Sequence, residues 1–458
     1  MNGPTSLFRI AVLTVSCALA LPVAVVADES RARLPLPARD ADFRQHPPEL
    51  VELGRLLFFD KEQSGNRDIS CATCHSPLIA TGDGLSTNIG TGGEGLSVSR
   101  DAGRFPPGLR DPLSRGSRNM TPLFNLGHVQ FDRFFWDGRL QVDPSIPQGF
   151  LTPAGRNLPF GFPSALAALS IFAQTERQEM LGEPGANELA DASLVHPELG
   201  VWEALVRRLG AIPEYVELFT DAFPAVGGDG ARITIVQVGT ALAAFQSVAF
   251  RSDNSPFDRY LRGDRAAMGP AAIRGMHLFY GRAECSGCHS GVFQTDLDFH
   301  AIGVPQVGPG MGDGPSGRED FARERVTRDP NDRYRFRTPS LRNTVLTGPW
   351  GHDGAFNSLE AIVRHDLSPW SSLASYDPAQ IVMPPRPDLD ALDLVAHKDA
   401  AVAAAIASAI EITPPQPALT EREVLDLLDF LQALTDPSAT DLRRWVPKRV
   451  PSGLPLAD

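Results

Sequence analysis

Apolar residues recur every three or four positions in several segments of the chain, which is the spacing of one face of a helix. In the first of these segments, from Glu49 to Phe59, the repeating positions are Leu50, Leu53, Leu56 and Leu57. Strand patterns are weak by comparison, so the sequence predicts a mainly α protein. The same spacing predicts further helices over Pro163–Leu181, Val201–Ala222, Ile233–Phe250, Pro270–Tyr280 and Glu421–Leu434.

The second half of the chain repeats the first in outline. Each half has a helical segment, a short cysteine motif, a long loop rich in Gly and Pro, and further helices. The two loops run from Gly82 to Gly108 and from Gly303 to Gly317, and their composition predicts irregular structure. A chain of 458 residues is long enough for two cores. We therefore expect two tandem domains, 28–252 and 253–458.

The first residues have the features of a secretory signal peptide. Arg9 precedes an apolar run from Ile10 to Leu21, and Val25-Val26-Ala27 offers a cleavage site with small residues. We predict a signal peptide over 1–27 and a mature periplasmic protein that begins near Asp28. The alternative is an uncleaved anchor, but Pro22 interrupts a run that is already short. No stable insertion into a membrane is expected.

The formal net charge of −13 argues against nucleic acid as a partner, because such binding needs a basic surface. The charge suits transient docking of a small basic redox protein. It is equally what solubility alone would require.

Two strings of the form C-x-x-C-H carry the chemistry. Cleavage of the signal would remove Cys17, and the four remaining cysteines all lie in these strings. Two thiols three positions apart can each form a thioether to a haem, and the next histidine then faces the iron. The two sets are Cys71, Cys74 and His75, and Cys285, Cys288 and His289.

A four-cysteine zinc site and a thioredoxin-like dithiol are the alternatives to haem. The histidine that follows each motif and the missing βαβ pattern count against both. We expect two c-type cytochrome domains, each around one covalently bound haem, with long irregular loops.

Four longer strings resemble the bacterial di-haem cytochrome c peroxidase family, which includes the MauG-type enzymes. They follow one another in the family's order and extend over most of the mature chain. The strings are Leu53–Asp60, Phe135–Arg139, Ser255–Leu261, and Thr338–Asn343 with His352-Asp353-Gly354.

The resemblance implies roles for a tryptophan and a glutamate. In the family the N-terminal haem binds peroxide, the C-terminal haem takes in electrons, and a tryptophan lies between them; Trp136 matches it. A glutamate in a Glu-Met pair assists peroxide cleavage, and Glu179-Met180 is the match. A packed core aromatic is the other interpretation of Trp136. The other interpretation of Glu179 is a solvated side chain on a helix.

The resemblance also implies a calcium ion between the domains, bound by Asn119, Thr347 and Pro349. Oxygen ligands of this kind suit a hard cation, although three loop residues would indicate nothing by themselves. Family members commonly form homodimers, so a homodimer is a further expectation.

The sequence departs from many family members on the far side of both haems. No histidine occurs between His75 and His128, so the first iron has no histidine from that loop and is expected to stay five-coordinate. At the second iron, counting from the His352 string reaches Asp366, with His365 beside it and Met383 farther along. The sequence leaves open which of the three binds the iron, or whether any does.

Three functions follow from these expectations. The first is a periplasmic peroxidase that reduces hydrogen peroxide with electrons from a small protein such as cytochrome c or a cupredoxin. The second is a MauG-like enzyme that oxidises Trp or Tyr residues of a partner protein. The third is a non-catalytic electron-transfer cytochrome, and an open iron beside Glu179 would count against it.

Overall fold

Helices make up most of the regular structure in the computed structural model, which describes residues 1, 3, 34–100, 115–411 and 418–456. The predicted signal peptide 1–27 lies outside the described residues except for residues 1 and 3, as do residues 101–108 of the first predicted loop. Within the described ranges, none of the helices combines the length and apolar character that a membrane crossing requires.

The helices and strands follow in chain order. The α-helices are α1 (Pro48–Phe59), α2 (Cys71–Cys74), α3 (Ala165–Leu169), α4 (Glu188–Ser193), α5 (Pro197–Gly210), α6 (Pro213–Ala222), α7 (Ile235–Ala249), α8 (Pro256–Leu261), α9 (Pro270–Phe279), α10 (Glu324–Thr327), α11 (Leu359–Leu367), α12 (Pro369–Ala374), α13 (Pro387–Asp393), α14 (Val395–Lys398), α15 (Ala400–Ala409) and α16 (Glu421–Ala433). The strands are β1 (Arg133–Phe134), β2 (Leu140–Val142), β3 (Phe150–Leu151), β4 (Phe299–His300) and β5 (Phe336–Arg337). Strands β1, β2 and β3 form one antiparallel sheet in that order, and β4 pairs with β5.

Four of the predicted helices are confirmed almost to the residue as α1, α7, α9 and α16. Local sequence explains where they start. Proline occupies the first turn of α1 and α9, where its missing N–H costs nothing. Capping boxes begin α7 at Thr234 and α16 at Thr420.

Two predicted helices are wrong as single elements. Pro213 starts a new helix, so Val201–Ala222 divides into α5 and α6. The segment Pro163–Leu181 forms only the short α3 and then irregular turns, because distant groups take the carbonyls that a helix would use. The indole N–H of Trp202 donates to the Ile171 carbonyl at 2.8 Å, and the Gly65 N–H donates to the Met180 carbonyl at 2.7 Å.

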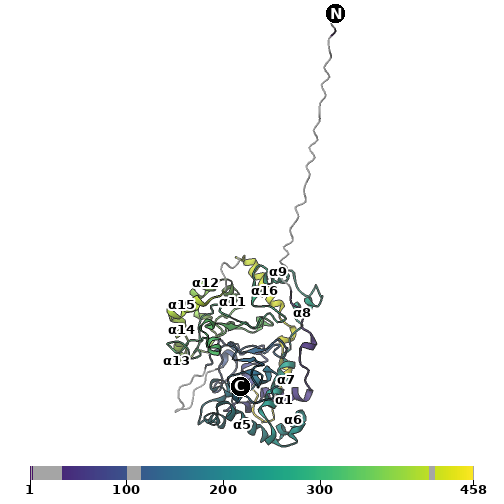
Figure 1. Ribbon diagram of the computed structural model, residues 1–458, viewed down its shortest axis with the longest axis vertical. Coiled ribbons are helices and arrows are strands. Elements are labelled where there is room, and N and C mark those ends of the chain that lie inside the picture. Colours follow the sequence, from purple (N-terminus) through teal and green to yellow (C-terminus); the bar gives the residue numbers. More distant parts are fainter. Residues whose placement is uncertain (2, 4–33, 101–114, 412–417, 457–458) are drawn as a thin grey trace.

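Each half of the chain has its own core, and Figure 1 shows them as two stacked parts. The first core gathers α1, α3, α5, α6 and α7, and the second gathers α8, α9 and α16. The C-terminal segment leaves the second part, because Leu442 and Val450 are buried in the first core and Trp445 meets Phe245 edge-on at 5.9 Å. The domain boundary near residue 252 stays a prediction, and the chain end lies across it.

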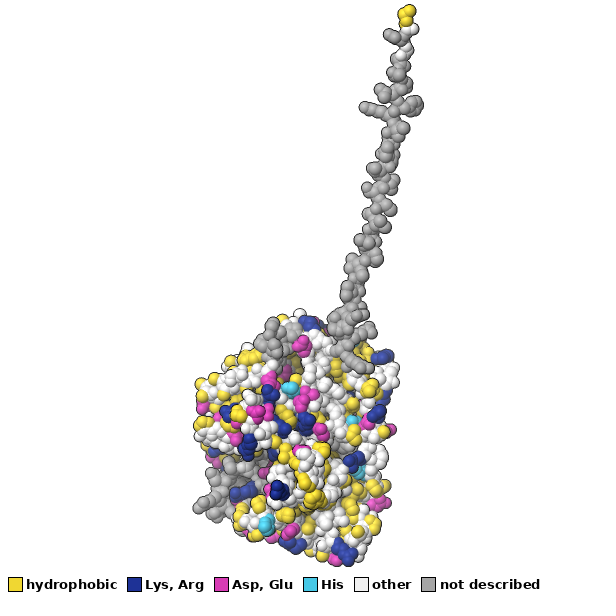
Figure 2. Space-filling model, viewed as in Figure 1, with side chains coloured by type: hydrophobic (Ala, Val, Ile, Leu, Met, Phe, Trp, Pro, Cys, Tyr) yellow, Lys and Arg dark blue, Asp and Glu magenta, His cyan; other side chains and the backbone are white. Residues whose placement is uncertain are grey.

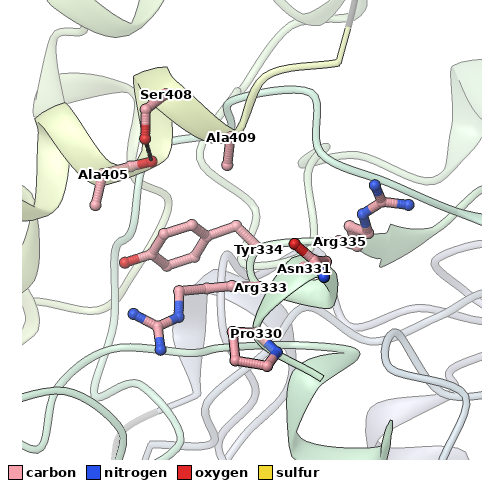
Figure 3. A pocket seen from close by; sticks show the side chains of 8 residues that line it. All are labelled: Pro330, Asn331, Arg333, Tyr334, Arg335, Ala405, Ser408 and Ala409. Atoms are coloured by element: carbon pink, nitrogen blue, oxygen red, sulfur yellow. Dashed lines mark hydrogen bonds between the residues drawn. The ribbon is translucent and has the colours of Figure 1, made fainter. Parts of the chain in front are cut away.

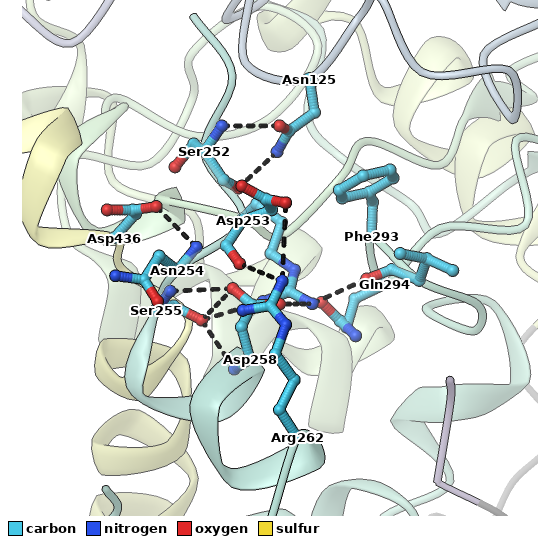
Figure 4. A network of polar contacts seen from close by, with 12 residues as sticks. Asn125, Ser252, Asp253, Asn254, Ser255, Asp258, Arg262, Phe293, Gln294 and Asp436 are labelled. Atoms are coloured by element: carbon cyan, nitrogen blue, oxygen red, sulfur yellow. Dashed lines mark hydrogen bonds and ion pairs between the residues drawn. The ribbon is translucent and has the colours of Figure 1, made fainter. Parts of the chain in front are cut away.

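The predicted boundary lies inside a buried polar network, shown in Figure 4. Asn125 of the first half exchanges two hydrogen bonds with the backbone of Ser252, at 2.7 and 2.8 Å. From the second half, the Asn343 amide donates to the Ser252 hydroxyl at 2.8 Å. The Asn254 N–H donates to the Asp436 carboxylate at 2.7 Å. The connection is therefore held from both sides rather than being an open linker.

The same helix pair supports the cysteine motif in both halves. Helix α1 precedes the first motif and packs on α7, and α9 precedes the second and packs on α16. Each contact needs a glycine, because a Cβ on Gly54 would overlap the Ala241 carbonyl and one on Gly275 would overlap the Asp426 carbonyl. The two glycines let the helix backbones approach closely.

Replacing either glycine by alanine should destabilise the protein. The added methyl group forces two helix backbones apart, and overpacking of this kind costs about 1–3 kcal/mol. Denaturant unfolding of the holoprotein would measure the loss for Gly54→Ala and Gly275→Ala. Gly269→Ala is the matched control, since nothing lies within 4 Å of a Cβ there. Equal stability of all three variants would contradict the packing argument.

Candidate active site

The first cysteine motif forms one turn of helix, α2, with its histidine directly after it. Ser70 and Thr73 form a capping box that starts the turn at Cys71. His75 ends the turn, and its Nδ1 lies 3.1 Å from the Thr81 carbonyl. A carbonyl only accepts, so Nδ1 carries the proton and the lone pair is on Nε2. This tautomer is the one that an iron ligand needs.

The second motif repeats the arrangement. Cys285–Gly287 form a 3-10 turn, and the Nδ1 of His289 lies 3.0 Å from the Gln294 carbonyl. Burial lowers the pKa of both motif histidines, that of His75 to about 4, so both are neutral near pH 7. The four motif cysteines form no disulfide. Both motifs thus fit the ligand set of a c-type haem.

The turn that carries Glu179 lies beside the first motif because Met180 of that turn packs there. Met180 is buried in a small cluster with Ile69 and Cys74. The turn Arg177–Leu181 that carries both residues is a π-helical turn. The first loop closes on it, since the Thr91 N–H donates to the Glu179 carbonyl at 2.8 Å. The structure therefore brings the turn that carries the predicted acid–base residue to the first motif, and the role of Glu179 stays a prediction.

The Glu179 carboxyl has an environment suited to proton transfer. Burial raises its pKa to about 7, the nearby Glu176 adds to this, and Arg139 partly opposes it. A group with a pKa near the working pH can both take up and return a proton. Glu179 accordingly meets the chemical requirement for a general acid and base.

Two arginines at this site were not predicted as site residues from the sequence. Arg100 is buried, and its guanidinium donates to the carbonyls of Ile89, Gly90 and Gly95 at 2.7–2.8 Å, which fixes the loop beside Glu179. Arg139 lies 3.7 Å from the ring centroid of Phe135. Arg139 belongs to the matching string Phe135–Arg139, so its position there was the available clue.

Trp136 lies where the two halves meet. It is 9% exposed, and its indole N–H donates to the Asn119 carbonyl at 2.9 Å. Its own carbonyl accepts from the N–H of Arg337, in β5 of the second half, at 2.8 Å. The first half therefore binds the indole N–H, and the second half binds the backbone of Trp136.

A buried group of three charged residues supports this junction. Arg118 donates to Asp137 at 2.8 Å and to both oxygens of Asp320 at 2.6 and 2.8 Å. Burial alone would raise the pKa of both carboxyls, but the positive charge of Arg118 outweighs burial and lowers both pKa values. Arg139 also lowers the pKa of Asp137. Asp137 follows Trp136 directly and Asp320 belongs to the second half. The three residues are named the Arg118 triad below.

Asn119 lies next to the segment that follows the other two predicted calcium ligands. Its N–H donates to the His352 carbonyl at 2.8 Å, and its side-chain amide donates to the Leu85 carbonyl at 2.9 Å. That orientation reserves Oδ1 as an acceptor. Thr347 and Pro349 lie shortly before His352 in the chain, and the three-residue calcium site stays a prediction.

The three candidates for the far side of the second iron lie in different surroundings. Asp366 is on α11 near Cys285, His365 contacts the Ile302 carbonyl, and Met383 contacts Thr87 of the first half. The sequence left these three residues as alternative ligands. In the tertiary structure each of them has different neighbours.

A surface hollow of about 380 Å³ lies away from these groups (Figure 3). Arg333, Tyr334 and Arg335 line one side of it, and α15 lines the other. The two cations are already paired, Arg333 with Glu324 and Arg335 with Glu411. The lining includes none of the predicted site residues, so the hollow is not the candidate active site.

Comparison with known proteins agrees with this arrangement. Residues 48–266 match the family model described as di-haem cytochrome c peroxidase. The chain is similar to the methylamine utilization protein MauG of Methylorubrum extorquens, with 34% identity over 318 residues that cover 69% of this chain and 68% of MauG. The chain belongs to the di-haem cytochrome c peroxidase family.

Other relatives of this di-haem family member point the same way. The cytochrome c551 peroxidase of Pseudomonas aeruginosa is 29% identical over 324 residues, covering 70% of this chain and 72% of that protein. The crystal structure of a MauG-like protein associated with microbial copper homeostasis superposes with a TM-score of 0.56 at 25% identity. It covers 95% of this chain and 100% of that one.

Membership of the di-haem cytochrome c peroxidase family confirms the predicted family, the mainly helical fold and an oxidoreductase function. It implies two haems, peroxide as a reactant, and a redox protein or protein substrate as partner. The individual roles of Glu179, Trp136 and the calcium residues stay predictions.

Removing the central charge of the Arg118 triad should destabilise the protein strongly. Arg118→Met leaves Asp137 and Asp320 buried without their main partner, and breaking a buried ion pair costs about 3–5 kcal/mol. The pKa of each carboxyl in the folded state lies below the ordinary 3.8. The contribution of these ion pairs to the free energy of unfolding is therefore present at neutral pH and is lost only as the pH falls below 3.8.

Denaturant unfolding at pH 7 and at pH 3 would test this. The difference between Arg118→Met and the parent should shrink at the lower pH. Arg39→Met, which breaks an exposed pair with Asp42, is the control and should change the stability little. A loss for Arg118→Met no larger than for the control would refute the role given to the triad.

Proposed function

We propose that the protein is a periplasmic di-haem peroxidase that reduces hydrogen peroxide to water with electrons from a small redox protein. The observation that carries the proposal is that the turn bearing Glu179 packs on Cys74 of the first motif through Met180, while the Glu179 carboxyl is itself buried. A carboxyl that can exchange protons beside the peroxide-binding iron serves O–O cleavage and is not needed for simple electron transfer. It therefore counts against a non-catalytic cytochrome.

The haems are held covalently in this proposal, one by Cys71, Cys74 and His75 and the other by Cys285, Cys288 and His289. The support is the ligand geometry, in which each histidine has a proton fixed on Nδ1 and a lone pair on Nε2. The haems supply the redox chemistry when bound. Residues 28–252 form the peroxidatic domain and 253–458 the domain that takes in electrons.

Glu179 handles the protons of the reaction. Peroxide, two electrons and two protons give two waters, so one peroxide oxygen must lose its proton while the other gains one as it departs. A carboxylate near both oxygens can accept the first proton and return it to the leaving oxygen. The first loop, fixed by Arg100, is bonded to the turn that carries this carboxyl.

Trp136 provides the route between the two halves. Its indole is a large π system at the junction. The indole N–H is bonded to the Asn119 carbonyl, and the Trp136 backbone carbonyl is bonded to the Arg337 N–H. The Arg118 triad limits its movement. Trp136 therefore acts as a relay for electrons from the second domain, rather than only as a core residue.

The remaining parts of the proposal concern location and partners. The segment 1–27 directs export to the periplasm, and the partner is a cytochrome c or a cupredoxin. On the face drawn in Figure 2, acidic and basic side chains of the described residues are mixed. The attraction of a basic partner at long range is therefore assigned to the net charge of −13. The proposal also includes a homodimer and a calcium ion bound by Asn119, Thr347 and Pro349.

A second candidate function is oxidation of Trp or Tyr residues in a partner protein. Two observations favour it: the identity of 34% with MauG, and the absence of histidine between His75 and His128. Peroxide turnover with reduced cytochrome c separates the two functions. Rapid, sustained oxidation of the cytochrome supports the peroxidase, and a long-lived oxidised spectrum of both haems with little turnover supports protein modification.

Glu179→Gln should slow the reaction with peroxide by about 10²–10⁴-fold, the usual contribution of a general acid–base group. In the parent, the rate should fall as the pH drops below about 7, because the carboxylate takes up a proton near that pH. Stopped-flow haem absorbance would measure both effects.

Glu176→Gln is the matched control for this experiment, since Glu176 is exposed and directly precedes the turn Arg177–Leu181. It should keep most of the rate and move the pH midpoint slightly downward, because Glu176 helps to raise the pKa of Glu179. An unchanged rate in Glu179→Gln would exclude the proton-transfer role. No reaction of the parent with peroxide, with both haems attached, would exclude both enzyme functions.

Trp136→Phe should slow peroxide turnover with reduced cytochrome c but leave the direct reaction of the first haem with peroxide unchanged. Phenylalanine keeps an aromatic ring but is harder to oxidise. Steady-state turnover and single-turnover spectra of the same sample would separate the two steps. Trp202→Phe is the control, because that indole is also buried and also donates to a backbone carbonyl, yet lies in the first core. Equal turnover in the two variants would count against the relay.

A further inference from the structure

Helix α11 lies against the second cysteine motif and presents one face to it. Leu359 and Val363 pack against the second core, the cluster against which Cys285 also packs. Residues three or four positions apart share a face of a helix. Asp366 follows Val363 by three positions, so the backbone places it on the face that meets Cys285.

The carboxyl of Asp366 is buried there without a partner for one of its oxygens. Oδ1 is excluded from solvent and accepts no hydrogen bond. The charge of Asp366 also helps to raise the pKa of the Cys285 thiol, after the larger effect of burial, so the two groups are close. Burying a carboxylate oxygen without a partner is costly, and a bound cation would offset that cost.

His365 faces a different cluster on the opposite flank of α11. Its Nε2 donates to the Ile302 carbonyl at 2.8 Å, and its ring lies 4.9 Å from that of Phe356. Ile362, three positions earlier, packs in this same third cluster with Phe356. The Nδ1 of His365 is buried and unpaired, but it lies within this cluster and not on the face that meets Cys285.

Met383 lies against the first half of the chain. Its sulfur accepts a hydrogen bond from the Thr87 N–H at 3.4 Å, and its side chain packs on Leu85 and Ile89. These contacts hold the thioether in the interface between the halves.

We propose that Asp366 supplies a carboxylate oxygen as the sixth ligand of the iron bound by His289. The inference rests on the attachment of the second haem at Cys285, Cys288 and His289 in the proposed function. An anionic oxygen is a hard donor that stabilises ferric iron more than a thioether does. The second haem should therefore have a lower reduction potential than it would with methionine in that position.

Spectroscopy of the purified ferric holoprotein tests this ligand directly. In Asp366→Asn and Asp366→Met, the electron paramagnetic resonance signal and the visible spectrum of one haem should change while those of the other stay as in the parent. The reduction potential of the changed haem should rise in both variants, more in Asp366→Met, where a thioether can take the carboxylate's place. A haem count and the thermal midpoint establish that each variant is folded and loaded.

Two matched controls lie on the same helix. His365→Gln should leave the spectra and potentials of both haems unchanged, which separates the two neighbouring residues. Glu360→Gln removes an exposed carboxyl that pairs with Arg364, and it should likewise change neither haem.

The inference is overturned if Asp366→Asn and Asp366→Met both keep the parent's spectra and potentials, or if His365→Gln changes the second haem instead. Either result leaves the proposed function intact, because that is tested by the reaction of the parent with peroxide. Failure of the parent to react, with the Asp366 variants still changing one haem, would remove the peroxidase proposal and keep the ligand.

Discussion

Pairing of buried charge at the junction of the two halves is the constraint on which the rest of the structure depends. Arg118 cannot be buried alone, and it is neutralised by Asp137 from the first half and by Asp320 from the second. Asp137 is the residue after Trp136, so the same ion pairs that join the halves also fix the indole between them. Stability and the proposed electron route therefore share one set of contacts.

The two halves use one structural device for cofactor attachment and then diverge. In each, the helix before the cysteine motif packs closely on a later helix through a glycine, and a backbone carbonyl fixes the tautomer of the motif histidine. The differences lie on the far side of each motif. Glu179 reaches the first motif from a π-helical turn, and Asp366 reaches the second from α11. In the proposed function, these two carboxyl groups give two similar motifs different chemistry.

The irregular backbone at the first motif has a physical cause. The segment before Glu179 has the apolar spacing of a helix, yet Trp202 and Gly65 bind carbonyls that helical N–H groups would otherwise take. Gly90 passes so close to this turn that a Cβ there would overlap the backbone. The carboxyl of Glu179 is positioned by these long-range contacts, which replace a regular helix at the place where the proposed chemistry occurs.

The sequence by itself determined the two C-x-x-C-H motifs, the family resemblance and the helices α1, α7, α9 and α16, because each depends on spacing or capping within a few residues. Only the tertiary structure decided what depends on distant contacts. It divided Pro163–Leu181 into turns, brought Arg100 and Arg139 to Glu179, and separated Asp366 from His365. Adjacent positions on a helix point about 100° apart, so neighbours in sequence can face different cores, and only the packing of that helix distinguishes them.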